Sequence, residues 1–172
     1  MSTMKIYTKI SLFLLISLLA GLSSCIEDEQ YPLVPRIEYS GFSTIRDVAG
    51  KDSIGKITIS YTDGDGNLGY LNDADTIGPH KYNFYLNFLE QVNGKLQPVQ
   101  MPDPNITFNA RFPYLAPEGR NKNIKGDITM QLDLYLARQA LLSDTIAFQI
   151  YIMDQALNKS NVIDTPRYKI KK

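Results

Sequence analysis

The sequence predicts an all-β fold, an antiparallel β-sandwich of seven to eight short strands. Apolar and polar residues alternate with a period of two along almost every segment from Arg36 onward. Clusters of Gly, Pro, Asn and Asp separate these segments at short intervals, and no long segment has helical spacing. A chain of 172 residues with 44% hydrophobic and 21% charged residues has the size and composition of one globular domain.

The expected strands follow one another closely along the chain. Asn93 and Gly94 both tolerate a positive φ, so they predict a two-residue hairpin turn. Residues 134–142 have helix spacing and lack β-branched side chains, which predicts a short helix or an irregular crossover. Pro113 and Pro117 limit the fifth strand to an edge, and Pro166 bends the last one. The expected strands are residues 37–42, 57–61, 82–88, 95–100, 106–114, 128–134, 146–152 and 162–170. Strands of this spacing are typical of an immunoglobulin-like sandwich.

Residues 1–24 have the layout of a cleaved secretory signal. Lys5 and Lys9 form a small positive region, and residues 10–22 are an almost unbroken apolar run that is too short to span a bilayer comfortably. Cleavage before Cys25 would leave 16 of the 18 basic residues against 18 acidic ones, a net charge of −2.

Cys25 is the only cysteine and directly follows the apolar run. The order Leu22-Ser23-Ser24-Cys25 resembles a bacterial lipobox, which implies that Cys25 carries the membrane anchor. Two or three acyl chains would hold the protein stably, since each buried methylene contributes about 0.8 kcal/mol. The alternative is a free core cysteine, but a thiol at the end of a leader has no core around it.

Residues 25–35 are expected to form a tether between the lipid and the domain at residues 36–172. The acidic cluster in the segment Ile26-Glu27-Asp28-Glu29-Gln30 resembles the signal that sends lipoproteins of Bacteroidota to the outer face of the outer membrane. A plain solvated tether is the alternative reading. The expected location is therefore the outer membrane, on its periplasmic or its surface-exposed face. Pro32 and Pro35 stiffen the approach to the domain.

Three motifs in the same order resemble the small immunoglobulin-like lipoproteins of Bacteroidota. They are the lipobox, the segment Asp63-Gly64-Asp65-Gly66-Asn67-Leu68-Gly69, and the segment from Asp154 to Asn161, which has the form D-x-A-x-N-x-S-N. The resemblance implies the fold and the location, because the function of such proteins is largely uncharacterised. Leu157 stands where the family usually has glycine.

The acidic loop, residues 63–70, contains the densest group of oxygen ligands in the chain. Asp63, Asp65 and Asn67 supply oxygens at alternate positions on a backbone that glycines allow to curl, a pattern suited to calcium. Asp73 and Asp75, together with Asn72, are candidates for further ligands. The loop is not an EF-hand, because the positions that require glycine and glutamate hold Leu68 and Ala74. A plain Asp-Gly turn is the alternative.

The closing loop, residues 154–161, follows a strand and is expected at the same end of the sandwich as the acidic loop. Asp154 could then complete the same calcium site. Alternatively, Asp154 and Asn158 brace their own turn through bonds from side chain to backbone.

Catalysis and nucleic-acid binding have little support. His80 is the only histidine, and Cys25 is committed to the anchor, so neither a Cys–His pair nor a zinc site is expected. A pair of carboxylates for glycoside hydrolysis is not excluded. The formal net charge is zero, which gives no electrostatic signal for nucleic acid. Tyr85 and Tyr151 are outward-facing and suggest either a contact platform or a cross-strand pair.

These features predict a lipid-anchored, non-catalytic binding or adhesion module of the cell envelope, with a protein or glycan ligand of unknown identity. The two loops are expected to point away from the membrane, stiffened by calcium. The alternative is a structural accessory subunit that docks onto an outer-membrane protein assembly through its sheet face or edge.

Overall fold

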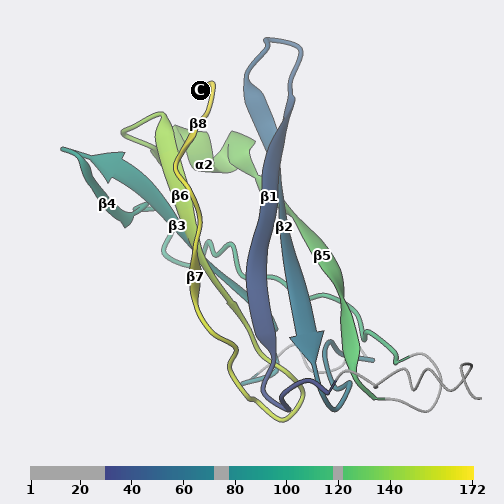
Figure 1. The fold of residues 1–172 in the computed structure, drawn as a ribbon. Helices are drawn as coiled ribbons and strands as arrows, with labels where there is room; N and C mark the ends of the chain where they lie inside the picture. The colour runs from purple at the N-terminus through teal and green to yellow at the C-terminus, as the bar shows by residue number, and fades with distance from the viewer. Residues whose placement is uncertain (1–29, 72–77, 118–121) are drawn as a thin grey trace, which may run out of the picture.

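The computed structural model describes residues 30–71, 78–117 and 122–172. It is a sandwich of two antiparallel sheets (Figure 1), as the alternating pattern predicts. The first sheet has the order β1-β2-β5, formed by Arg36–Arg46, Asp52–Asp63 and Ile124–Asp133. The second has the order β4-β3-β6-β7, with β8 also paired to β6, formed by Lys95–Pro98, Phe84–Val92, Thr145–Ile152, Ile163–Asp164 and Tyr168–Lys169. This order matches an immunoglobulin-like sandwich in which, among the described residues, the first sheet has strands A, B and E and lacks strand D.

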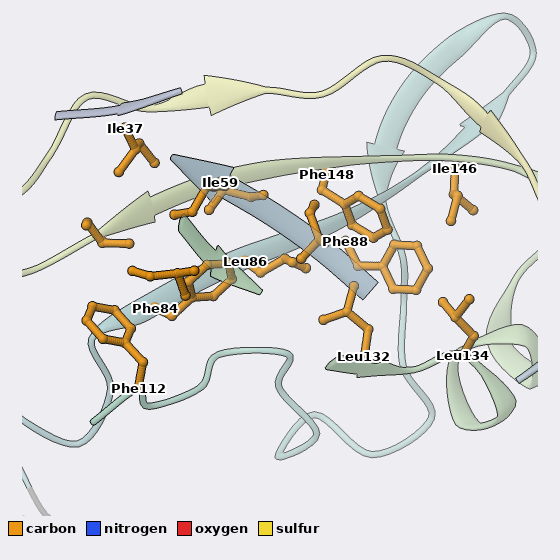
Figure 2. Close-up of a cluster of buried hydrophobic side chains, with 14 of the residues drawn as sticks. Ile37, Ile59, Phe84, Leu86, Phe88, Phe112, Leu132, Leu134, Ile146 and Phe148 are labelled. Atoms are coloured by element: carbon orange, nitrogen blue, oxygen red, sulfur yellow. The ribbon is translucent and has the colours of Figure 1, made fainter. Parts of the chain in front are cut away.

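The core lies between the sheets and follows from the pleat, since every second side chain of a strand points to one face. Ile57 and Ile59 of β2 point inward, opposite Phe148 and Ile150 of β6, and all four are fully buried. Figure 2 shows how closely these aliphatic and aromatic side chains pack. Complete burial of one such side chain contributes about 2 to 3 kcal/mol, so this cluster holds the two sheets together.

The short helix expected after β5 is confirmed. Helix α2 spans Leu134–Ala140, and its preceding residue Asp133 accepts a hydrogen bond from the N–H of Leu136. Leu134 and Ala137 face the core and are fully buried. The Asn93-Gly94 turn is also confirmed, with φ angles of 52° and 79° between β3 and β4.

The strand expected at residues 106–114 is wrong. That segment makes two isolated bridges, Ala110 to Phe84 and Pro113 to Tyr70. The buried amide of Asn83 takes the place of a neighbouring strand, because it donates to the carbonyl of Phe112 and accepts from the N–H of Phe112. One side chain therefore satisfies the backbone where Pro113 could not continue a ladder.

The strand expected at residues 162–170 is present only as two short pieces, β7 and β8. Between them, Thr165 exchanges hydrogen bonds with Phe148 through its backbone N–H and its hydroxyl. Pro166 follows and has no N–H to donate, which interrupts the ladder.

The two ends of the sandwich differ in what they carry (Figure 1). The β1–β2 hairpin extends past the body of the domain at the end that also holds α2 and the β3–β4 hairpin. Strand β2 runs from this hairpin end to the opposite end, where it finishes at Asp63. The candidate site lies at the β2 terminus.

Candidate metal centre

Strand alternation places one aspartate on the core face at the end of β2 and another just beyond β6. Asp63 continues the inward series of Ile57, Ile59 and Tyr61, and its side chain is 0% exposed. Asp154 lies two residues after the buried Ile152 and is also 0% exposed. Two carboxylates are therefore buried at the same end of the core, where an unpaired charge is costly.

The structure brings Asp63, Asp65 and Asp154 together. One oxygen from each carboxylate lies within 4.8 Å of the others. An ion that binds oxygens at about 2.4 Å can contact two on opposite sides up to about 4.8 Å apart, so one calcium-sized ion could touch all three. The expectation that the acidic loop and the closing loop lie at the same end is thus confirmed.

Three oxygens of the acidic loop are buried without a hydrogen-bond donor among the described residues. They are Oδ1 of Asp63, Oδ1 of Asp65 and Oδ1 of Asn67. The opposite atoms of these side chains are held in place: Asp63 Oδ2 accepts from the N–H of Asn67 at 3.2 Å, and Asp65 Oδ2 accepts from Nδ2 of Asn67 at 2.9 Å. Each side chain is therefore anchored through one atom and presents the other, as in a preformed cation site.

The electrostatics of the cluster favour a cation. Burial, together with the nearby charges of Asp65 and Asp154, raises the pKa of Asp63 to about 6, although hydrogen bonds from the backbone of Asn67 and Gly66 act in the opposite direction. Within the described ranges, no lysine or arginine forms an ion pair with these three carboxylates. Positive charge in the middle of the cluster would stabilise the ionised form.

The closing loop makes the bracing bonds expected of Asp154 and also lies beside the acidic loop. Asp154 braces its own turn, because Oδ1 accepts from the N–H of Asn158 at 2.7 Å and Oδ2 accepts from its Nδ2 at 2.8 Å. It also faces Asp63 and Asp65. Leu157 has a φ of 64°, so this turn adopts the left-handed conformation that glycine normally takes.

Several bracing residues were not predicted from the sequence. Gln155 joins the two loops, since its Nε2 donates to the carbonyl of Gly69 at 2.8 Å and its N–H donates to the carbonyl of Asn67. Asn161 holds the start of β1, because its amide both accepts from and donates to the backbone of Ile37. The Ser160 hydroxyl accepts from the N–H of Ile152. The D-x-A-x-N-x-S-N pattern includes Ser160 and Asn161 at fixed positions, whereas Gln155 stands at a variable one.

Some expected site residues cannot be placed. Asn72, Asp73 and Asp75 lie outside the described residues, and so do the leader and Cys25.

Tyr85 and Tyr151 form a cross-strand pair. Their rings are stacked with centroids 4.6 Å apart, and Lys159 lies over the ring of Tyr151. His80 lies 3.2 Å from the Tyr70 hydroxyl. Among the residues that the structure describes, no helix is long and apolar enough to cross a membrane.

The expected orientation of the acidic loop, away from the membrane, depends on Cys25, which lies outside the described residues, but the described start of the chain lies against this loop. The N–H of Gly64 donates to the carbonyl of Pro32 at 2.9 Å, so the chain enters the domain beside the acidic loop. Pro32 is seven residues after Cys25, and seven residues of fully extended chain span at most about 25 Å. The hairpin end lies a whole strand further away, about 40 Å for a strand of this length.

Comparisons of the chain with protein-family models, with curated proteins and with solved structures found no significant match.

Proposed function

We propose that this chain is a lipid-anchored, non-catalytic binding module of the cell envelope whose tether-side end is closed by a calcium ion. The observation that carries the proposal is the set of three buried oxygens without donors, which lie in an acidic cluster with Asp154. Buried polar atoms are almost always paired, so three unpaired oxygens in one loop support a site for a further group. A divalent cation satisfies all of them at once.

The chemistry of the donor set supports calcium over other metals. Every candidate ligand is a carboxylate or amide oxygen, which suits calcium, whereas zinc prefers nitrogen and sulfur. Magnesium binds oxygens at about 2.0 to 2.1 Å, so it would draw the three carboxylates closer than calcium requires. Three carboxylates and the Asn67 carbonyl leave room for water ligands, as is usual for calcium.

Calcium would join two loops that lie far apart in the sequence. The acidic loop follows β2 of the first sheet, and the closing loop connects β6 to β7 in the second sheet. An ion between the two loops would therefore link one sheet to the other. It would also counteract the burial and the repulsion from Asp65 and Asp154, which together raise the pKa of Asp63. A stiffened end suits a module that holds a binding surface in a fixed position.

The surface presented to a partner would be the hairpin end. With the lipid on Cys25, the tether enters at the acidic end, and the β1–β2 hairpin lies furthest from the membrane. Val48 at the hairpin tip is fully exposed, and Ile45, Tyr135 and Leu142 at the same end are also exposed apolar side chains. Exposed apolar groups of this kind often mark contact with a protein or a glycan.

A second candidate function is a structural accessory subunit of an outer-membrane protein assembly. Strand β5, with ten residues, pairs on one side only with β2 in the described part of the chain. An unpaired strand edge is a template for a strand from another protein. Stable copurification with an envelope protein, unchanged by substitution of Asp63 and Asp65, would favour this function.

Calorimetry and elemental analysis test the calcium proposal directly. Calcium titrated into the purified protein should bind with a stoichiometry of one, and elemental analysis after dialysis should find one calcium per chain. Asp63→Ala and Asp65→Ala should abolish this binding. Asp164→Asn is the matched control, because Asp164 is exposed on the other sheet and bonds only Gln149 there.

Absence of heat and of bound metal in the wild-type protein would overturn the calcium proposal. Membrane attachment is tested separately, because Cys25→Ser should move the protein from the membrane fraction to the soluble fraction. Retention in the membrane fraction would contradict the lipid anchor.

A further inference from the structure

Residues 30–35, the last part of the tether, are packed against the acidic loop. The carbonyl of Pro32 accepts from the N–H of Gly64 at 2.9 Å, and the N–H of Tyr31 donates to Oδ1 of Asn123 at 3.2 Å. Lys125 lies over the ring of Tyr31, and Pro35 is buried. The tether therefore contacts both the acidic loop and the beginning of β5.

Gly64 makes this close approach possible. A Cβ atom at this position would lie 2.2 Å from the carbonyl oxygen of Tyr31 and 2.9 Å from that of Pro32. Both distances are below the contact that real Cβ atoms show, and the atoms concerned belong to the backbone. The docked tether thus depends on the absence of a side chain at residue 64.

The docking contact and the candidate ligands share the same stretch of backbone. Gly64 lies between Asp63 and Asp65, each of which has one oxygen without a donor and contributes to the cluster with Asp154. Without a cation, repulsion among the carboxylates favours conformations that move Asp63 and Asp65 apart, which also moves the N–H of Gly64 away from Pro32. A bound cation holds the two carboxylates together and keeps this N–H directed at the tether.

From this juxtaposition we infer that cation binding and docking of the tether are thermodynamically linked. The inference rests on the proposed calcium site and adds a regulatory role to it: calcium fixes the orientation of the domain relative to its anchor, and loss of calcium releases residues 30–35. Linkage is reciprocal, so a substitution that undocks the tether weakens calcium binding by the same factor that calcium strengthens docking.

Hydrogen exchange measured by NMR on the full-length protein, with calcium and without it, tests the linkage. The reporter amides are those of Tyr31 and Gly64, which donate the two docking hydrogen bonds. Calcium should slow their exchange about 5- to 150-fold, the usual range for coupled sites. The amide of Thr165, bonded to Phe148 at the centre of the second sheet, is the internal control and should change by less than twofold.

Two variants test the reverse direction, with calcium affinity as the measurement. Asn123→Ala removes the acceptor of the Tyr31 N–H from outside the acidic loop, and Gly64→Ala fills the space that the tether occupies. Both should raise the Kd for calcium at least fivefold. Gly41→Ala is the matched control, since a Cβ at Gly41 would meet nothing within 4 Å.

The outcomes separate the linkage from the site itself. If calcium binds but leaves the exchange of Tyr31 and Gly64 unchanged, and Asn123→Ala binds calcium with wild-type affinity, the linkage is overturned and the calcium site stands. If calorimetry detects no calcium binding to the wild-type protein, the site and the linkage are both overturned. Folding of each variant is checked by its thermal unfolding.

Discussion

Strand β2 begins and ends with a buried aspartate, and the two are in opposite situations. Asp52, at the hairpin end, accepts hydrogen bonds from the N–H of Lys171 at 2.8 Å and the Thr44 hydroxyl at 2.7 Å, and it lies 3.4 Å from Arg46. Asp63, at the tether end, faces the carboxylates of Asp65 and Asp154.

The two environments shift the pKa in opposite directions. Burial alone would raise the pKa of Asp52, but the bonds from Lys171 and Thr44 and the charge of Arg46 outweigh it, so the pKa is lowered. For Asp63, burial and the neighbouring carboxylates act together and raise the pKa to about 6. Both oxygens of Asp52 have donors, whereas Oδ1 of Asp63 has none among the described residues.

Glu90 extends the contrast at the hairpin end. It is 2% exposed, and its Oε2 accepts from the N–H groups of Leu142 and Ser143 at 2.7 and 3.0 Å. Both buried carboxylates of that end therefore have protein donors. Only the tether end presents buried oxygens without donors among the described residues.

The largest expected effect is at Asp52. Asp52→Asn removes the ion pair with Arg46 and turns one acceptor into a donor that meets the N–H of Lys171 or the Thr44 hydroxyl. Hydrogen bonds to a charged group contribute about 1.5 to 3 kcal/mol, so the free energy of unfolding should fall by about 3 kcal/mol. Chemical denaturation measures this, and a loss below about 1 kcal/mol would mean that Asp52 is not the structural aspartate of the pair.

The pH dependence of stability in calcium-free buffer should show the opposite behaviour of Asp63. Its pKa rises from 3.8 in the unfolded chain to about 6 in the folded one, so the folded protein binds the proton more tightly. The stabilisation is complete below about pH 3.8 and is lost as the pH rises through about 6. The free energy of unfolding should be about 2 kcal/mol greater at pH 4.5 than at pH 7.5.

The controls for the pH experiment are the variant Asp63→Asn and saturating calcium. Both should remove this rise, the first because no group titrates and the second because the bound ion keeps Asp63 ionised. A wild-type stability that falls steadily from pH 7.5 to 4.5 would contradict the assignment of Asp63.

The smallest expected effect is at Leu157, in the closing loop. An L-residue in the left-handed region is strained by about 1 to 2 kcal/mol, and substitution by glycine removes this strain. Glycine also makes the unfolded chain more flexible, which offsets about half of the stabilisation. Leu157→Gly should therefore raise the free energy of unfolding by about 0.5 to 1 kcal/mol. Thermal unfolding checks this, and a lower melting temperature for the variant would show that the half-exposed leucine side chain contributes more than its strain costs.

Patterns of period two predicted most of the fold. The alternation of apolar and polar residues predicted the core strands around Ile57, Phe84 and Ile150. The same alternation places the side chain of Asp63 on the core face of β2. Irregular segments were not predictable in this way. The bonds of Asn83 to Phe112 join residues 29 apart in the sequence, and no local pattern indicates which amide will replace a strand.

The candidate site was predictable in part for the same reason. The acidic loop stands out in the sequence, and sandwich topology brings Asp154 to the same end. The position of the tether depends on contacts such as Tyr31 with Asn123, 92 residues away, which spacing does not reveal. The sequence therefore indicated that Asp63, Asp65 and Asp154 lie together, but not that the chain enters the domain beside them.

The contrast between the two aspartates is tested most directly by four melting temperatures at pH 7.5: wild type and Asp63→Asn, each with and without calcium. Without calcium, the variant should melt several degrees above the wild type, because the new amide donates to Asp65 and Asp154 instead of repelling them. Calcium at 100 times its Kd should stabilise the wild type by about 2.7 kcal/mol, roughly 10 °C, and leave the variant nearly unchanged, so the order reverses. A variant that melts below the wild type in both conditions, with no effect of calcium on either protein, would contradict the account.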